Sequence, residues 1–323
     1  MESHTVLITT NYLEPDGEIR RVLERAGCAV TFSRPQDRGG DQGHLRSALW
    51  KAHAVIAGTE PFRADLIDCA PDLGIIARTG VGYDNVDLPA AAGRGIKVCV
   101  TPGVNRQSVA ELTLGLLIDA ARGIVTSERS VRAGSWTQCS GRELAGSTLG
   151  LVGLGAIGQA VATMARGIGM HVLAHDTEPD GAFVMDRGIE LCDLGDLLRR
   201  SDFVSIHVAL TPASKGMIGR TALATMKPGS YLVNTARGGI VDEVALAGAL
   251  CKGHLGGAAL DVLETEPLPA DHPLRSAPNV TITPHIAGAT TEARTRSSKM
   301  AASQIIDFFE GRPVAHLVPG ASR

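Results

Sequence analysis

Three successive apolar runs in the second half of the chain are each followed by a side chain that can do acid–base or anion-binding chemistry. Arg237 follows the first run, Glu264 and Glu266 follow the second, and His285 follows the third. If the runs are parallel strands, their carboxyl ends meet at one edge of a sheet, so we expect these side chains to lie close together.

The chemistry available to these residue types is specific. An arginine can hold a carboxylate through two parallel hydrogen bonds, which fixes the orientation of a 2-oxo acid. A histidine can give a proton to the carbonyl oxygen as a hydride reaches the carbon, and a paired carboxylate keeps that histidine protonated near neutral pH. The three residue types therefore indicate reduction of a 2-oxo acid, or the reverse oxidation of a 2-hydroxy acid.

A source of hydride is indicated by the glycine pattern Gly153-Leu-Gly155-Ala156-Ile157-Gly158, which follows an apolar run and precedes a helical segment. The first two glycines allow a tight turn and close approach of a pyrophosphate, and the third lets the helix pack close to the strand. Asp176 ends the next apolar run, 176 − 158 = 18 residues beyond the last glycine, where an acid binds the ribose hydroxyls. Its charge would repel a 2′-phosphate, so NAD is predicted rather than NADP.

Two series of apolar runs alternate with helical segments along the chain. Continuous apolar strands with helical crossovers predict parallel sheets covered on both faces. The break between the series falls at Thr101-Pro102-Gly103. The expected strands of the first series are 5–9, 28–32, 54–57, 74–77 and 96–100, and those of the second are 149–153, 171–175, 203–206, 231–234, 258–261 and 280–283.

Composition excludes several classes of protein. A net charge of −3 and a pI near 6.4 argue against nucleic-acid or anionic-membrane partners. The N-terminus lacks the basic start and apolar stretch of a signal peptide. The six cysteines are scattered without a C-x-x-C pair, which favours reduced thiols. A cytoplasmic protein is expected, and no metal site is predicted.

Five motifs, in order and over almost the whole chain, resemble the D-isomer-specific 2-hydroxyacid dehydrogenase family, with its phosphoglycerate-dehydrogenase-like branch the nearest. The motifs are Thr79–Asn85, Gly153–Gly158, Asn234–Gly239, Asp261–Pro267 and Pro284–Gly288. The resemblance implies an α/β fold of two doubly wound parallel-sheet domains with a cleft between them. The flavodoxin-like substrate-binding domain would comprise residues 1–102 and 289–323, and the Rossmann-type NAD-binding domain residues 103–288.

The same resemblance assigns roles to individual positions. Arg237 would bind the substrate carboxylate and His285 would be the acid/base, paired with Glu266. Glu264 is expected either to be solvated or to lie next to the residues that contact the substrate. The cofactor residues implied are Gly153, Gly155, Ala156, Ile157, Gly158, Asp176, Val208, Thr235, Ala236, Asp261 and Gly288. The substrate residues implied are Arg78, Val81 and Gly82 together with Arg237. His207 is assigned to the cofactor cleft or to a structural role, and a homodimer is expected.

Departures from the family narrow the substrate. Glu266 stands where formate dehydrogenases carry glutamine, and Val81 where phosphite dehydrogenase has lysine. The segment 57–60 lacks the arginine that phosphoglycerate dehydrogenases often place there, although Arg78 matches a basic position of that branch. Small 2-oxo acids with a neutral or weakly anionic end are therefore expected to outperform 3-phosphohydroxypyruvate, with D-3-phosphoglycerate dehydrogenase as the alternative.

A different class of function also fits the fold. NAD-sensing transcriptional co-repressors are similar to this family and retain the same three residues, but they carry peptide-docking features and long disordered tails, which are not seen in this compact chain. Turnover of a 2-oxo acid with NADH distinguishes the two hypotheses.

Overall fold

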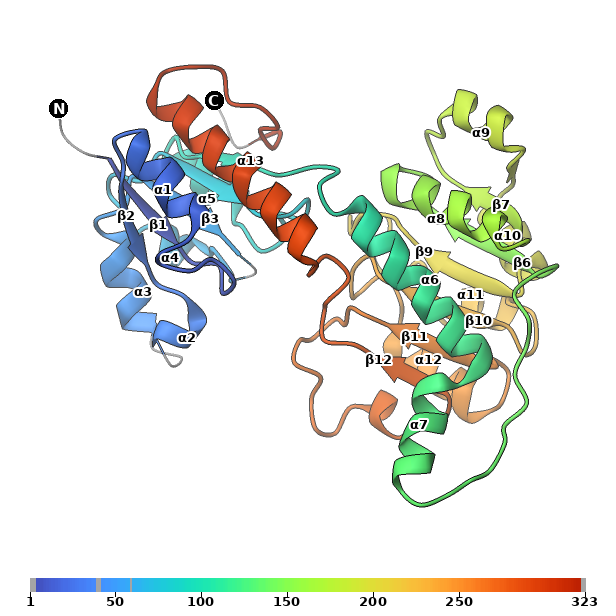
Figure 1. Cartoon of the computed structure of the whole chain (residues 1–323). Coiled ribbons are helices and arrows are strands. Elements are labelled where there is room, and N and C mark those ends of the chain that lie inside the picture. The colour runs from blue at the N-terminus through green and yellow to red at the C-terminus, as the bar shows by residue number, and fades with distance from the viewer. Residues whose placement is uncertain (1–3, 39–41, 59, 321–323) are drawn as a thin grey trace. The chain divides into compact units, whose positions relative to one another are not determined.

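The computed structural model of the chain describes residues 4–38, 42–58 and 60–320 and divides into two compact units (Figure 1). The first unit comprises Met1–Asn105 and Thr291–Arg323, and the second unit comprises Arg106–Thr290. The sequence-based boundaries were 102/103 and 288/289. Across the described residues, no helix combines the length and apolar character needed to cross a membrane.

The first unit contains a five-stranded parallel sheet of order β2-β1-β3-β4-β5, the flavodoxin-like order. Each strand matches one predicted run to within two residues at either end. The strands are β1 (Thr5–Ile8), β2 (Ala29–Phe32), β3 (Ala54–Ala57), β4 (Ile75–Arg78) and β5 (Lys97–Cys99). The helices are α1 (Glu18–Arg25), α2 (Pro35–Arg38), α3 (Gln42–Leu49), α4 (Ala64–Ile67), α5 (Leu88–Gly93) and α13 (Thr291–Phe309).

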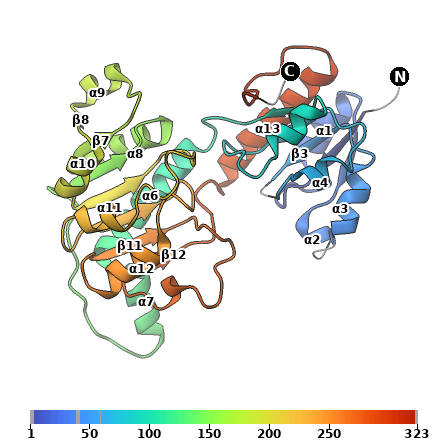
Figure 2. The ribbon, with the colours of Figure 1, turned by 180° about the vertical axis from the view of Figure 1, so that it is seen from behind.

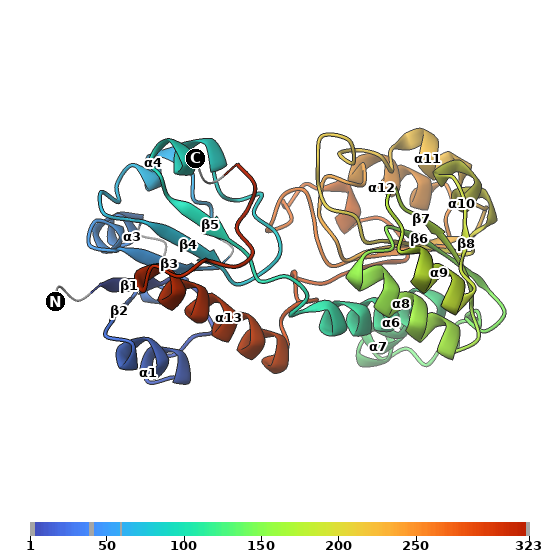
Figure 3. The same cartoon turned by 90° about the horizontal axis from the view of Figure 1, so that it is seen from above.

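Helices cover both faces of this sheet, as Figure 3 shows. Alternate residues of the strands point to opposite faces, so Val6 and Ile8 pack with α1 and α13, whereas Leu7 packs with α3 and α4. The C-terminal helix α13 therefore belongs to the sheet formed by the first hundred residues. Gly74 lies so close to the ring of Phe308 in α13 that an added Cβ would be 2.6 Å from it.

The second unit contains a seven-stranded, fully parallel sheet of order β12-β11-β10-β9-β6-β7-β8. Read from β8, this is the dinucleotide-binding order 3-2-1-4-5-6 with one strand added at the end. The strands are β6 (Thr148–Val152), β7 (His171–His175), β8 (Glu190–Leu191), β9 (Phe203–Ile206), β10 (Tyr231–Asn234), β11 (Gly257–Leu260) and β12 (Val280–Ile282). The predicted fold class, two doubly wound parallel sheets, is confirmed.

Two sets of helices cover this second sheet. One face packs against α6 and α8, seen in front of the sheet in Figure 1, and the other against α10, α11 and α12, seen in front in Figure 2. The helices are α6 (Arg106–Arg122), α7 (Ile124–Arg132), α8 (Ala156–Gly167), α9 (Gly181–Arg187), α10 (Leu194–Arg200), α11 (Arg220–Thr225) and α12 (Glu243–Cys251), with a 3₁₀ turn at Pro273–Arg275.

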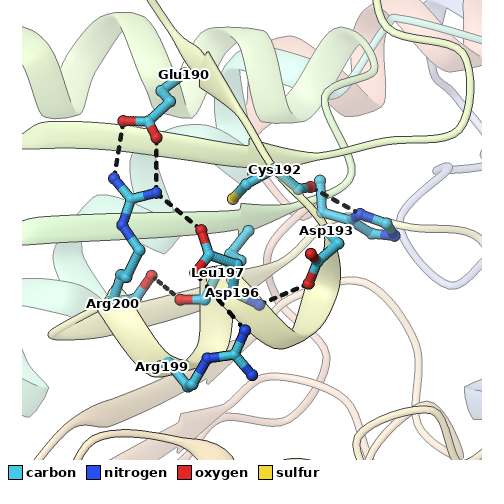
Figure 4. Close-up of polar contacts among 9 residues, drawn as sticks. Glu190, Cys192, Asp193, Asp196, Leu197, Arg199 and Arg200 are labelled. Carbon is cyan, nitrogen blue, oxygen red and sulfur yellow. Dashed lines mark hydrogen bonds and ion pairs between the residues drawn. The ribbon is translucent and has the colours of Figure 1, made fainter.

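Strand β8 was not predicted: the sequence indicated six strands here. Its two residues are exposed, so they leave no apolar run. An ion-pair cluster with α10 accompanies this short edge strand (Figure 4): both carboxylate oxygens of Glu190 bond Arg200, at 2.6 and 2.8 Å, and Arg200 also bonds Asp196. The hydrogen bond from Arg200 keeps the pKa of Glu190 below its ordinary value.

Candidate active site

Because all strands of the second sheet are parallel, the segments after β6, β7, β9, β10, β11 and β12 leave it at the same edge. These segments carry the glycine motif, Asp176, Val208, Arg237, Glu266 and His285, in that order. The fold thus brings to one edge residues that are up to 132 positions apart in the chain (285 − 153).

The glycine motif has the backbone shape that a dinucleotide requires. Gly153 has a φ of +100°, and an added Cβ would lie 2.8 Å from the backbone of His207. A Cβ on Gly158 would approach the carbonyl oxygen of Gly153 far inside contact distance, whereas the space beside Gly155 is open. Gly155 also caps α8 without a side-chain hydrogen bond, so the first amides of that helix face a place where an anion can approach. The residues present fit the pyrophosphate of NAD.

Asp176 lies directly beside this loop. Its Oδ2 accepts a hydrogen bond from the Leu154 amide at 2.6 Å, and its Oδ1 accepts one from the Glu178 amide at 2.8 Å. The carboxylate is therefore fixed against the glycine motif and remains half-buried, which leaves lone pairs for hydroxyl donors.

The other residues assigned to the cofactor lie around the same edge. The Cγ1 of Val208 lies against Gly153, and the hydroxyl of Thr235 bonds that of Thr113 in α6 at 2.8 Å. Ala236 accepts a bond from Arg237 Nη1 at 2.7 Å, and Gly288 is half-buried just after the loop that carries His285.

Asp261 is 1% exposed, and its carboxylate is bonded to that loop. Oδ1 accepts from the Thr283 hydroxyl at 2.6 Å and the Ile286 amide at 2.8 Å, and Oδ2 accepts from the Ala287 amide at 2.8 Å. The loop is further fixed by the His285 amide, which donates to Asp261 O at 2.9 Å, while His285 itself adopts a φ of +54°. A left-handed backbone at a non-glycine residue persists where its surroundings hold it, and here Asp261 does so.

His285 and Glu266 form a hydrogen-bonded pair: Nδ1 lies 2.9 Å from Oε2, and the two side chains are 38% and 39% exposed. The other oxygen of Glu266 accepts from the Leu263 amide at 3.0 Å. Because an ionised carboxylate can only accept, Nδ1 carries the hydrogen, and Nε2 is the ring atom left for proton transfer.

The electrostatics of the pair favour an ionised Glu266. Burial raises the pKa of this carboxyl group, but the hydrogen bonds from His285 and the Leu263 amide lower it. The positive charges of His285 and Arg237 lower it further, so the pKa lies below its ordinary value. Arg237 therefore acts on the same carboxylate as His285.

Close backbone packing explains why Arg237 and Glu266 are neighbours. A Cβ on Gly238 would lie under 3.0 Å from backbone atoms of Leu263 and Glu264. Only glycine lets the segment after β10 rest on the segment after β11. Gly238 lies within the predicted motif Asn234–Gly239 but was given no role of its own there, although a glycine directly after a functional arginine was a usable signal.

The surroundings of His207 favour the neutral form of its imidazole. Burial lowers the pKa of His207 to about 3, and its Nε2 lies 2.9 Å from the Ser205 hydroxyl. A residue in this state can support the glycine motif that it contacts, but it cannot supply a proton near neutral pH.

The residues assigned to the substrate, apart from Arg237, lie in the first unit. Arg78 ends β4, is 7% exposed and donates from Nε to the Gly82 carbonyl at 3.2 Å, while Val81 is 43% exposed. In the segment after β3, Glu60 Oε1 accepts from the Gly58 amide at 3.3 Å. Thr59 of that segment lies outside the described residues.

Comparison with known proteins agrees with this geometry. Residues 114–287 match the family model described as "D-isomer specific 2-hydroxyacid dehydrogenase, NAD binding domain". The chain is 44% identical over 266 residues to a glyoxylate reductase of Korarchaeum cryptofilum, covering 80% of each chain. It is 44% identical over 270 residues to a D-3-phosphoglycerate dehydrogenase of Mycobacterium leprae, covering 83% of this chain but 51% of that relative.

Among solved structures, the TT0316 protein from Thermus thermophilus superposes with a TM-score of 0.86 at 39% identity, covering 97% of this chain and 99% of that one. The family resemblance read from the sequence is therefore confirmed. The chain belongs to the D-isomer-specific 2-hydroxyacid dehydrogenase family and is an NAD-dependent oxidoreductase that acts on a CH–OH group.

Proposed function

We propose that this enzyme interconverts a small 2-oxo acid and its 2-hydroxy acid, in the D configuration where that product is chiral, with Arg237, Glu266 and His285 as the reacting group. The observation that carries the proposal is the 2.9 Å hydrogen bond between His285 Nδ1 and Glu266 Oε2, with Arg237 acting on the same carboxylate. In this reading the second unit binds NAD and the first unit contributes substrate contacts through Arg78, Val81 and Gly82.

Each side chain has one task in the reduction. Arg237 binds the substrate carboxylate with its guanidinium and orients the carbonyl. His285 donates the Nε2 proton to the carbonyl oxygen, and Glu266 stabilises the imidazolium and fixes its orientation through Nδ1. NAD held by the glycine motif would supply the chemistry of hydride transfer to and from the carbonyl carbon. The histidine must be protonated for reduction and neutral for oxidation.

The glycine motif and Asp176 account for the choice of cofactor. Amides at the start of α8 would meet the pyrophosphate, and the Asp176 carboxylate, fixed by Leu154 and Glu178, would accept bonds from the ribose hydroxyls. A 2′-phosphate at the same place would meet a carboxylate and suffer repulsion.

For the substrate we propose glyoxylate or a 2-oxo acid of similar size. Glu60 stands at the carboxyl end of β3, bonded to Gly58, and puts an acid where a second anionic group of a longer substrate would need a cation. Several similar proteins are named glyoxylate reductase. The second candidate, D-3-phosphoglycerate, is favoured by the buried guanidinium of Arg78 at the end of β4 and by the relatives that carry this name.

The test is a comparison of kcat/KM for glyoxylate, hydroxypyruvate and 3-phosphohydroxypyruvate with NADH, in the wild type and in Arg78→Ala. The proposal expects one of the first two to be the best substrate. A preference for the phosphorylated substrate that Arg78→Ala abolishes would establish the second candidate instead. Reduction of none of about a dozen 2-oxo acids would contradict both.

A homodimer in the cytoplasm is part of the same proposal. Apolar side chains on and after α7 are exposed, with Ile124 at 51%, Val131 at 48% and Trp136 at 88%, and such a surface fits burial against a second copy. All six cysteines are free thiols, which suits a reducing compartment. Light scattering after size-exclusion chromatography tests the dimer, and a monomer at micromolar concentration would contradict it.

A further inference from the structure

Glu243 and His272 form a second histidine–carboxylate pair, which is bonded to the loop that carries Glu266. Glu243, the first residue of α12, is 6% exposed, and its Oε2 lies 3.2 Å from Nε2 of His272. The other ring nitrogen, Nδ1, accepts a hydrogen bond from the Leu274 amide at 3.3 Å. Nδ1 therefore carries no hydrogen, and Nε2 is the donor to Glu243.

The free oxygen of Glu243 is bonded to the loop that carries Glu266. Oε1 accepts from the Glu264 amide at 2.6 Å, and the preceding amide, Leu263, donates to Glu266 itself at 3.0 Å. Two consecutive amides of this loop are thus held by two carboxylates, one from α12 and one from the loop's own Glu266. The same Leu263–Glu264 peptide rests on Gly238.

Through Glu243, the segment that carries Arg237 is connected to the loop that carries Glu266. Arg237 precedes α12 by only a few residues, and Glu243 at the start of that helix reaches across to the Glu266 loop. A shift of the Glu264 amide would move Glu266, and with it the hydrogen-bond partner of His285.

We propose that Glu243 and His272 are positioning residues that hold the loop 263–266, and so set the place of Glu266 relative to Arg237 and His285. The inference rests on the proposed function, because the role of Glu266 is part of that proposal.

A contribution to folding stability does not explain why Glu243 and His272 are present. Burial raises the pKa of Glu243, and the nearby charges of Glu264 and Glu266 raise it further. The hydrogen bond from the Glu264 amide lowers it by less, so the pKa lies above its ordinary value. A carboxylate kept in such surroundings is unfavourable for folding compared with an apolar side chain of similar size. What the Glu243 carboxylate provides instead is a fixed position for the Glu264 amide.

The main test compares Glu243→Ala and Glu266→Gln by the pH dependence of kcat for NADH-driven reduction. Glu243→Ala should lower kcat about tenfold or more, since small misplacements of reacting groups have large effects on rate. It should also move the midpoint of the pH profile in the same direction as Glu266→Gln. Glu264→Gln, at an exposed side chain of the same loop, is the matched control and should leave the profile in place.

A double variant and a measurement without turnover separate positioning from general damage. In the Glu266→Gln background, Glu243→Ala should change kcat less than about twofold, because its effect passes through Glu266. Hydrogen exchange of the peptide that covers residues 260–268 should be faster in Glu243→Ala, while the NADH dissociation constant stays within about threefold of the wild-type value. Glu243→Gln keeps an oxygen for the Glu264 amide and should restore most of the rate.

Failure of this inference can be told from failure of the proposed function. If Glu266→Gln alters rate and profile but Glu243→Ala alters neither, or if the two effects multiply in the double variant, the inference is wrong and the proposed function stands. If Glu266→Gln alters neither, the proposed role of Glu266 is wrong and the inference falls with it. Should Glu243→Ala fail to fold, His272→Ala leaves the carboxylate in place and should move the profile in the same direction by a smaller amount.

Discussion

Replacing Asp261 by Asn exchanges one carboxylate oxygen for an NH₂ group at nearly constant shape. Oδ1 can keep its bonds from Thr283 and Ile286, but the new amide nitrogen would face the Ala287 N–H from 2.8 Å, donor against donor. The site is 1% exposed, so water cannot take over. The loss of one hydrogen bond to a charged group amounts to about 1.5–3 kcal/mol. For the 185-residue second unit (290 − 106 + 1) this is a fall in Tm of about 3–12 °C.

The loop thus loosened carries His285, so turnover should fall at least about tenfold while NADH binding changes little. Thermal unfolding, fluorescence titration with NADH and steady-state reduction measure the three quantities on the same preparation. Asp271→Asn, at an exposed acid in the same unit, is the control and should leave all three unchanged. An NADH dissociation constant raised tenfold or more at unaltered Tm would refute this reasoning, because the carboxylate would then serve the cofactor rather than the loop.

Four further outcomes are expected. Gly238→Ala should lower kcat/KM about 10²-fold by forcing the two loops apart, whereas Gly248→Ala, with open space around it, should not. The wild type should favour NADH over NADPH at least about tenfold in kcat/KM, and Asp176→Ala should reduce that ratio mainly by weakening NADH; equal use of both cofactors would count against it. Glu266→Gln should move the pH profile of reduction toward acid, and Glu264→Gln should not. Since the pKa of Glu266 is lowered in the folded protein, its contribution to stability is present above the ordinary carboxyl pKa and lost as pH falls through the lowered one. The difference in Tm between wild type and Glu266→Gln should therefore narrow below about pH 4.

The alternation of apolar runs and helical segments was sufficient to predict the sheets, because buried parallel strands are apolar along their whole length. Strand β8 could not be predicted in this way, because Glu190 and Leu191 are exposed and form no apolar run. The contacts to Arg200 that accompany this strand come from ten residues further along the chain.

The convergence of Arg237, Glu266 and His285 could also be anticipated, since strands that run parallel place their following loops at one edge. The groups that support them could not. Glu243 meets an amide 21 residues away and His272 meets Glu243 from 29 residues away, and no local spacing rule links such positions. Likewise, the family resemblance assigned Asp261 to the cofactor. Only the structure shows that its carboxylate accepts three hydrogen bonds from the turn after β12.

Helix α13 gives the first unit an unusual order of assembly during translation. Its residues Ala301, Ala302 and Ile305 cover the face of the sheet that carries Val6 and Ile8, yet the 185 residues of the second unit are made in between. At about 5–20 residues per second, the ribosome needs roughly 10–40 s to pass from one to the other. The second unit is continuous and can complete its core during this time, whereas the face of the first sheet that carries Val6 and Ile8 is covered by α1 but not yet by α13. A nascent chain released before residue 291 would keep that face partly exposed, and we expect it to be retained by chaperones or to aggregate.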